Sequence, residues 1–219
     1  MGVFMVNVLR SFGLVISFVL LSLSFSANAV ELKIPKLKKS SGGANINDAK
    51  LKFTKIFFKS SLDYMEAQYH LFNAMEMNDE ASRTKKSIDF VKDDKKKEGK
   101  RLTNAFTTVS ENSSAIEVAL TKEKVISAEG KVHYAKALPH AVSGALGTIQ
   151  LPPEAKSLLD TIKADKMAAL KLMDFVKVLP EIPNYVKSIS NVTKLIVTGA
   201  KTRGVEGADD ANAALGSLN

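Results

Sequence analysis

Residues 46–77 constrain the fold of this chain more than any other segment. Wrapped at 100° per residue, they carry two apolar stripes separated by a narrow polar wedge. The first stripe contains Ala49, Phe53, Ile56, Phe57, Tyr64, Ala67, Leu71 and Met75, and the second contains Leu51, Phe58, Leu62, Met65, Tyr69 and Phe72. A helix that is apolar over most of its girth must be covered from two sides. We therefore expect a central helix with at least two partner helices.

The rest of the chain shows helical periodicity punctuated by proline and glycine. We predict further helices over 79–110, over 114–147, from Pro153 to Pro180 and from Pro183 to Gly199. Asn45 is the expected N-cap of the first helix, and Ser114 with Glu117 reads as a capping box that opens the helix over 114–147. We expect Pro139 to kink or break the helix over 114–147. The alternative to separate helices over 79–110 and 114–147 is one long kinked helix.

No segment after residue 44 shows the two-residue alternation of a strand. The predicted fold class is therefore all-α, an elongated bundle of four or five helices formed by residues 45–200. Residues 201–219 are expected to be a C-terminal tail with one short helical turn.

The N-terminal region has the pattern of an export signal. An uncharged apolar block runs from Phe12 to Phe25, and Ala27-Asn28-Ala29 then supplies the small side chains that a signal peptidase accepts. We predict that residues 1–29 are a signal peptide cleaved after Ala29, with an uncleaved N-terminal anchor as the alternative. Residues 30–44 would then be a flexible basic leader, or a strip that lies in a groove of its own or another chain.

Charge and cysteine content narrow the class of protein. The chain has 219 residues, a formal net charge of +8 and no cysteine. The missing cysteines exclude a disulfide framework, c-type haem attachment and cysteine-based zinc or iron–sulfur sites. An exported chain without cysteine fits a bacterial periplasm better than a eukaryotic secretory route.

Motifs that carry catalytic chemistry are missing from the sequence. Ser143 lies in Ala-Val-Ser-Gly-Ala, without the flanking glycines and preceding strand of a nucleophile elbow. The chain has no Walker loop, no HExxH and no EF-hand loop. We therefore predict a protein that is not an enzyme and that has no cofactor.

The three histidines are the first candidates for a metal or haem site. His70 falls in the polar wedge of the first helix, and we expect it to be solvated. His133 and His140 are seven residues apart, so on one continuous helix they share a face but lie about 10 Å apart, too far for one metal. A bend at Pro139 would bring them closer.

A basic segment between residues 83 and 101 is the predicted contact with an anionic partner. It holds nine Lys or Arg residues against four Asp or Glu residues. The basic residues are Arg83, Lys85, Lys86, Lys92, Lys95, Lys96, Lys97, Lys100 and Arg101. Export removes nucleic acid from consideration, which leaves phospholipid headgroups, lipopolysaccharide or an acidic protein. The alternative is a solvated helix surface with i,i+4 ion pairs.

The layout of the second half resembles that of exported all-helical proteins of Gram-negative bacteria with no assigned activity. The resemblance rests on "YAKALPHAVSGALGTIQLPPEAKSLLDTI", "FVKVLPEIPNYVKSISNVTKLIVTGAKTRG" and the closing "DDANAALGSL". It implies an exported helical protein and brings no site residues with it.

The leading hypothesis is a non-enzymatic periplasmic helical-bundle protein that binds a protein partner or the anionic envelope surface. A membrane-inserting helical protein and a metal- or haem-binding bundle are the alternatives.

Overall fold

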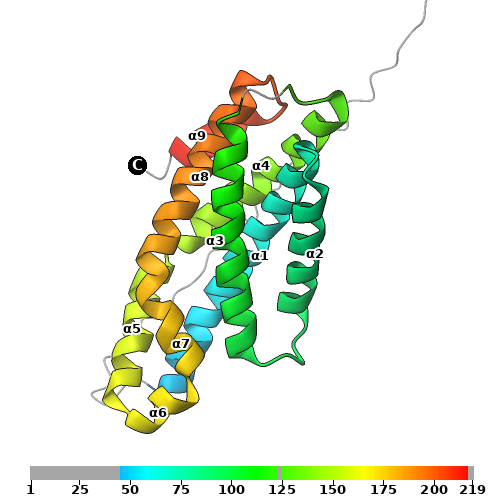
Figure 1. Ribbon diagram of the computed structural model, residues 1–219. Helices are drawn as coiled ribbons and strands as arrows, with labels where there is room; N and C mark the ends of the chain where they lie inside the picture. The colour runs from blue at the N-terminus through cyan, green and yellow to red at the C-terminus, as the bar shows by residue number, and fades with distance from the viewer. Residues whose placement is uncertain (1–44, 123–124, 217–219) are drawn as a thin grey trace, which may run out of the picture. The chain divides into compact units, whose positions relative to one another are not determined.

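The computed structural model describes residues 45–122 and 125–216, and in these residues every regular element is a helix (Figure 1). The all-α prediction is therefore confirmed. The chain divides into two units, Met1–Ser41 and Gly42–Asn219, and the described residues all belong to the second. The predicted signal peptide, its cleavage site after Ala29 and the leader at 30–44 lie outside the described residues.

Helix α1 (Ile46–Ala74) lies at the centre of the described helices. It begins as predicted, because the Asn45 Oδ1 atom accepts a hydrogen bond from the backbone N–H of Asn47 at 3.0 Å. Helix α1 contacts α2 (Asn78–Lys92), α3 (Glu98–Leu120), α4 (Ala128–Thr148) and α5 (Leu151–Ala164). Both apolar stripes are largely covered, although Leu51 is exposed. The prediction of a helix with at least two partners is confirmed.

The predicted helix over 79–110 is wrong, because α2 and α3 are separate helices joined by residues 93–97. Asp93 leaves the helical conformation, with φ −74° and ψ 101°. Its Oδ1 atom accepts a hydrogen bond from the backbone N–H of Lys95 at 3.0 Å. This hydrogen bond from a side chain to the backbone competes with the helical hydrogen bonds and favours a turn. The chain therefore reverses direction in the segment 93–97, which contains no apolar side chain.

The predicted break near residue 114 is also wrong, because α3 runs through it to Leu120. The Ser114 hydroxyl donates back to the carbonyl of Ser110 at 3.3 Å, so it bonds within the helix and caps nothing. The next helix, α4, begins after Ser127, whose Oγ atom accepts from the Gly130 N–H at 3.0 Å. Pro139 lies inside α4 and does not end it.

The predicted helix from Pro153 to Pro180 is interrupted twice. It consists of α5, α6 (Lys166–Lys171), α7 (Met173–Val178) and the 3₁₀ turn Leu179–Glu181. Asp165 causes the first interruption, because its Oδ1 atom accepts from the N–H groups of Met167 and Ala168 at 2.9 and 3.2 Å. Asp165 therefore ends α5 and caps α6.

The C-terminal helices pack more extensively than predicted. Helix α8 (Ile182–Thr202) agrees with the predicted helix from Pro183 to Gly199 and buries Ile189 and Ile196. Residues 201–219 were predicted to hold one helical turn, but they contain the nine-residue helix α9 (Ala208–Gly216). Helix α9 packs on α4 and α8 and buries Leu215, and this packing stabilises a helix that is too short to be stable alone.

Helices α1 and α4 approach closely along a stretch of small residues. A methyl group at Gly144 would lie 2.9 Å from the backbone nitrogen of Tyr64 and 3.1 Å from the carbonyl oxygen of Ser60. A methyl group at Gly147 would lie 2.9 Å from the Ser60 Cβ atom. The two glycines thus permit a close approach of the α1 and α4 backbones.

Candidate binding surfaces

The basic segment predicted as a contact site occupies three pieces of structure. Arg83, Lys85, Lys86 and Lys92 lie on α2, Lys95, Lys96 and Lys97 lie in the connection 93–97, and Lys100 and Arg101 lie in the first turn of α3. All nine are exposed except Arg101, which is half-buried. Exposure alone does not make a cation available to an external anion, because many of these side chains already contact groups of the protein itself.

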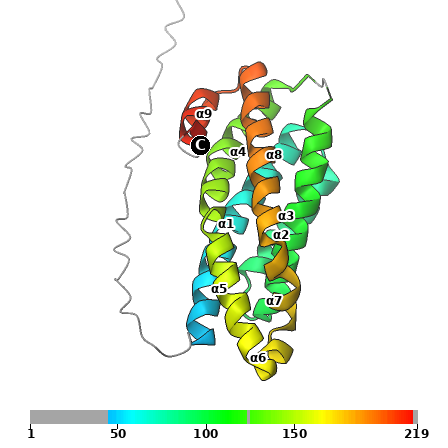
Figure 2. The same cartoon turned by 90° about the vertical axis from the view of Figure 1, so that its left-hand side faces the viewer.

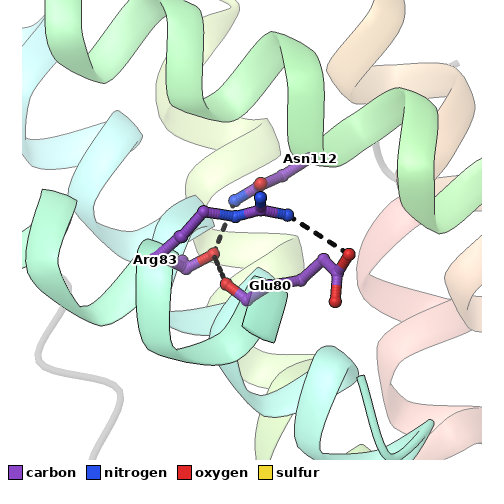
Figure 3. Close-up of polar contacts among 4 residues, drawn as sticks. Glu80, Arg83 and Asn112 are labelled. Carbon is purple, nitrogen blue, oxygen red and sulfur yellow. Dashed lines mark hydrogen bonds and ion pairs between the residues drawn. The ribbon is translucent and has the colours of Figure 1, made fainter. Parts of the chain in front are cut away.

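Four of the nine cations lie in ion pairs with nearby carboxylates. Figure 3 shows Arg83 turned toward Glu80, with a nitrogen–oxygen distance of 3.2 Å. The other pairs are Lys85–Asp89 at 3.4 Å, Lys92–Glu66 at 2.9 Å and Lys96–Asp93 at 3.9 Å. Exposed pairs of this kind contribute little stability, about 0.2–1 kcal/mol each, but they reduce the charge that is open to a partner.

Arg101 has a structural role. Its Nε atom donates to the carbonyl of Val91 at 2.7 Å, and its guanidinium lies 4.7 Å from the ring centroid of Phe58. The side chain thus ties the start of α3 to the end of α2 and to α1. An arginine that satisfies a backbone carbonyl and stacks on an aromatic ring is held in place and is a poor contact for an external anion.

Four lysines remain without an ion pair among the described residues: Lys86, Lys95, Lys97 and Lys100. Three of them lie within six positions at the connection between α2 and α3, where Asp94 and Glu98 are the nearest acids in sequence. Glu98 is bound to Lys50 on α1 at 2.7 Å. The predicted basic segment therefore reduces to a small cationic turn formed by Lys95, Lys97 and Lys100.

A buried polar network holds α1, α2 and α3 together behind this segment. Gln68 is fully buried, and its Nε2 atom donates to the Val109 carbonyl at 3.0 Å and to the Ser113 hydroxyl at 3.2 Å. The Asn112 amide donates to Gln68 Oε1 at 3.1 Å and to Thr84 Oγ1 at 2.9 Å. Figure 3 shows Asn112 reaching from α3 toward α2. The network ties α2 and α3 to α1.

The three histidines of the chain meet at the contact between α1 and α4, which the sequence did not predict. The Nδ1 atoms of His70 and His133 are 3.4 Å apart. The ring of His140 stacks on that of His70 with a centroid distance of 6.3 Å and an interplanar angle of 22°. The prediction that His70 is solvated is wrong, because it is half-buried between helices. The expectation that His133 and His140 share a face is confirmed, since α4 is continuous between them.

The surroundings of His70 favour its neutral form. Burial lowers its pKa below the ordinary value of 6.5, and the positive charges of His133, His140 and Lys136 lower it further. Glu66 acts in the opposite direction, but it also binds Lys92. Within residues 45–122 and 125–216, no group of three or more His, Asp or Glu side chains is arranged to hold a metal ion.

Two surface hollows also occur, and neither contains a histidine. One, of about 450 Å³, is lined mainly by Pro152, Pro153, Leu159, Pro180 and Pro183 between α5 and the start of α8. The other, of about 330 Å³, is lined by residues of the α1–α2 turn, the end of α3 and Arg203. Among the described helices, none is long and apolar enough to cross a bilayer.

Comparison with known proteins gives no assignment: no family model, curated protein or solved structure matches the chain.

Proposed function

We propose that this protein is a non-enzymatic binding protein of the bacterial periplasm that recognises an anionic surface of the envelope. The observation that carries the proposal is the cationic turn, where Lys95, Lys97 and Lys100 are exposed and have no ion pair among the described residues. In this proposal, the long helices form an elongated scaffold of four or five helices that holds the turn at one end. Electrostatic binding of this kind contributes about 1 kcal/mol per lysine near an anionic surface and weakens with salt.

A charge-reversal experiment tests this binding. Purified protein would be sedimented with anionic phospholipid vesicles and with lipopolysaccharide at 50 and 500 mM NaCl. We expect the variant K95E/K97E/K100E to lose at least tenfold in affinity at low salt. The matched control K59E/K131E/K194E reverses three exposed lysines elsewhere that also have no ion pair with another described residue, and it should lose much less. Equal losses in both variants would show that only net charge matters and would remove the proposed site.

The proposed location has a direct test of its own. Protein expressed from the full sequence in a Gram-negative host would be recovered from the periplasmic fraction, and its first residues would be sequenced. We expect the chain to begin at Val30. Protein that retains residues 1–29 and remains in the cytoplasm would contradict this part of the proposal.

A second candidate function is metal binding at His70 and His133. Two imidazole nitrogens on a tetrahedral zinc ion, each bonded at about 2.0–2.1 Å, are about 3.3–3.4 Å apart. The observed Nδ1 separation of 3.4 Å matches this spacing, and water would have to supply the remaining ligands. Calorimetric titration with zinc chloride should show one site that weakens at least tenfold in H70Q and H133Q but not in H140Q. Equal heats for the protein and H70Q would remove this candidate.

A further inference from the structure

Helix α6 and the start of α7 expose three large apolar side chains in one short segment. Met167, Leu170 and Met173 are 62%, 65% and 52% exposed. One long helix was predicted here, but the chain is interrupted at Asp165 and Leu172. These three side chains lie within seven residues of one another, and an exposed group of apolar side chains is typical of an interaction site.

This apolar segment lies at the same end of the molecule as the cationic turn. Gly99 in the first turn of α3 packs against Asp174 in α7, where a methyl group would lie 2.5 Å from the carboxylate oxygen Oδ2. Figures 1 and 2 both show α6, the connection between α2 and α3, and the start of α1 at one end of the helices. We call this end, with residues 93–100 and 163–174, the α6 end.

Further positive charge surrounds the apolar side chains. Lys163 lies near the end of α5, and Lys171 is the last residue of α6. Both are exposed and have no ion pair within the described part of the chain. The α6 end thus combines exposed apolar side chains with a surplus of lysine.

We infer that the α6 end docks onto an anionic phospholipid bilayer, with Met167, Leu170 and Met173 entering the headgroup boundary while the lysines contact phosphates. This inference rests on the proposed function and names its partner. Surfaces that combine apolar side chains with lysines bind at the bilayer interface, because burial and charge attraction add there. A second copy of the chain is the competing occupant, and the experiments below distinguish it from the bilayer.

Depth of insertion can be measured with a single tryptophan, because the chain has none. In the full protein, Leu170→Trp should show a blue-shifted emission and quenching by brominated lipids with vesicles containing 30% phosphatidylglycerol. Val125→Trp places the same reporter in the turn between α3 and α4, where the side chain is also exposed, and should not respond. Absence of quenching at position 170 under conditions where the protein sediments with these vesicles would overturn the inference.

The apolar and charged contributions can be separated by substitution. M167S/L170S/M173S should reduce partitioning onto anionic vesicles by roughly 10- to 100-fold, because each side chain contributes part of its burial free energy. V118S/V125S/V132S replaces three other exposed apolar side chains and should change it less than twofold. All variants would be checked for unchanged circular dichroism and thermal midpoint.

The outcomes distinguish this inference from the function on which it rests. If K95E/K97E/K100E loses vesicle binding and M167S/L170S/M173S does not, the result supports the proposed lysine site and contradicts bilayer docking through the α6 end. If K95E/K97E/K100E binds vesicles as tightly as the unchanged protein does, the proposed function itself is contradicted. Self-association that M167S/L170S/M173S abolishes, without vesicle binding by the unchanged protein, would identify a second copy as the occupant and overturn bilayer docking.

Discussion

His70 on α1 and His133 on α4 face each other with their Nδ1 atoms 3.4 Å apart, although they are 63 positions apart in the sequence. At this distance one ring can donate to the other only while at least one Nδ1 atom is unprotonated. Protonation of both rings places two positive charges in contact, with Lys136 and His140 close by and Glu66 as the opposing charge. The stability of the contact between α1 and α4 should therefore depend on pH.

The free energy of unfolding should fall as the pH is lowered through about 6.5. The pKa of His70 is lower in the folded protein than its ordinary value of 6.5, so the unfolded chain binds more protons. The contribution of His70 to the free energy of unfolding is fully present above pH 6.5, the ordinary pKa of histidine, and is lost as the pH falls through the lowered pKa of the folded state. Urea unfolding at pH 7.5 and pH 5.5 should show a lower midpoint at the acidic pH.

The control for this prediction is His70→Gln, which keeps a polar side chain and removes the titration. The difference between the two midpoints should become smaller in this variant. His140→Gln leaves the pair of His70 and His133 intact and should retain more of the difference. A pH dependence that is identical in the protein and in H70Q would show that other groups cause it.

The sequence predicted the helices whose periodicity is uninterrupted. Helix α8 and the two-sided helix α1 were found close to their observed bounds, because their apolar side chains repeat regularly over five turns or more. The interruptions at Asp93 and Asp165 were missed. In each case one carboxylate accepts backbone N–H bonds and ends a helix that the apolar pattern alone would continue. Asp is common within helices, so its presence did not reveal these turns.

The candidate site was predicted only as a stretch of sequence. Ion pairs determine which lysines can contact an external anion. Lys92 and Glu66, for example, are 26 positions apart in the sequence and meet because α2 packs on α1. The histidine cluster depends in the same way on the register of α4 on α1. The exposed Met167 and Leu170 follow from the turn at Asp165. A single sequence contains none of this tertiary geometry.

Gly144→Ala should destabilise the protein by about 1–3 kcal/mol, because the added methyl group overpacks the contact between α1 and α4. That methyl group would lie 2.9 Å from the backbone nitrogen of Tyr64, and backbone atoms cannot move aside cheaply. Gly216→Ala is the matched control, since nothing lies within 4 Å of its added methyl group. Chemical denaturation should give a stability for G216A equal to or above that of the unchanged protein. Equal stability of G144A and G216A would contradict the close approach.

Gln68 and Asn112 should show strong energetic coupling. Gln68→Leu leaves the half-buried Asn112 amide with Thr84 as its remaining partner and removes the buried hydrogen bonds of Gln68, and we expect a loss of about 2–4 kcal/mol. Asn112→Leu should also destabilise, and the double variant should lose less than the sum by about 1–3 kcal/mol. A double-mutant cycle from urea unfolding measures this coupling. Additive losses would show that the hydrogen bond between the two amides contributes nothing.

Asp165→Ala should loosen α6 and lower stability by about 0.5–2 kcal/mol, because the N-cap of this helix is lost. The Asp165 carboxylate holds the backbone N–H groups of Met167 and Ala168, so these amides should exchange with deuterium faster in the variant. Asp160→Ala is the control, since Asp160 is exposed on α5 and caps no helix. Hydrogen exchange of residues 166–171 measured by mass spectrometry provides the comparison. Unchanged exchange in D165A would show that packing, and not the cap, fixes the turn that exposes Met167 and Leu170.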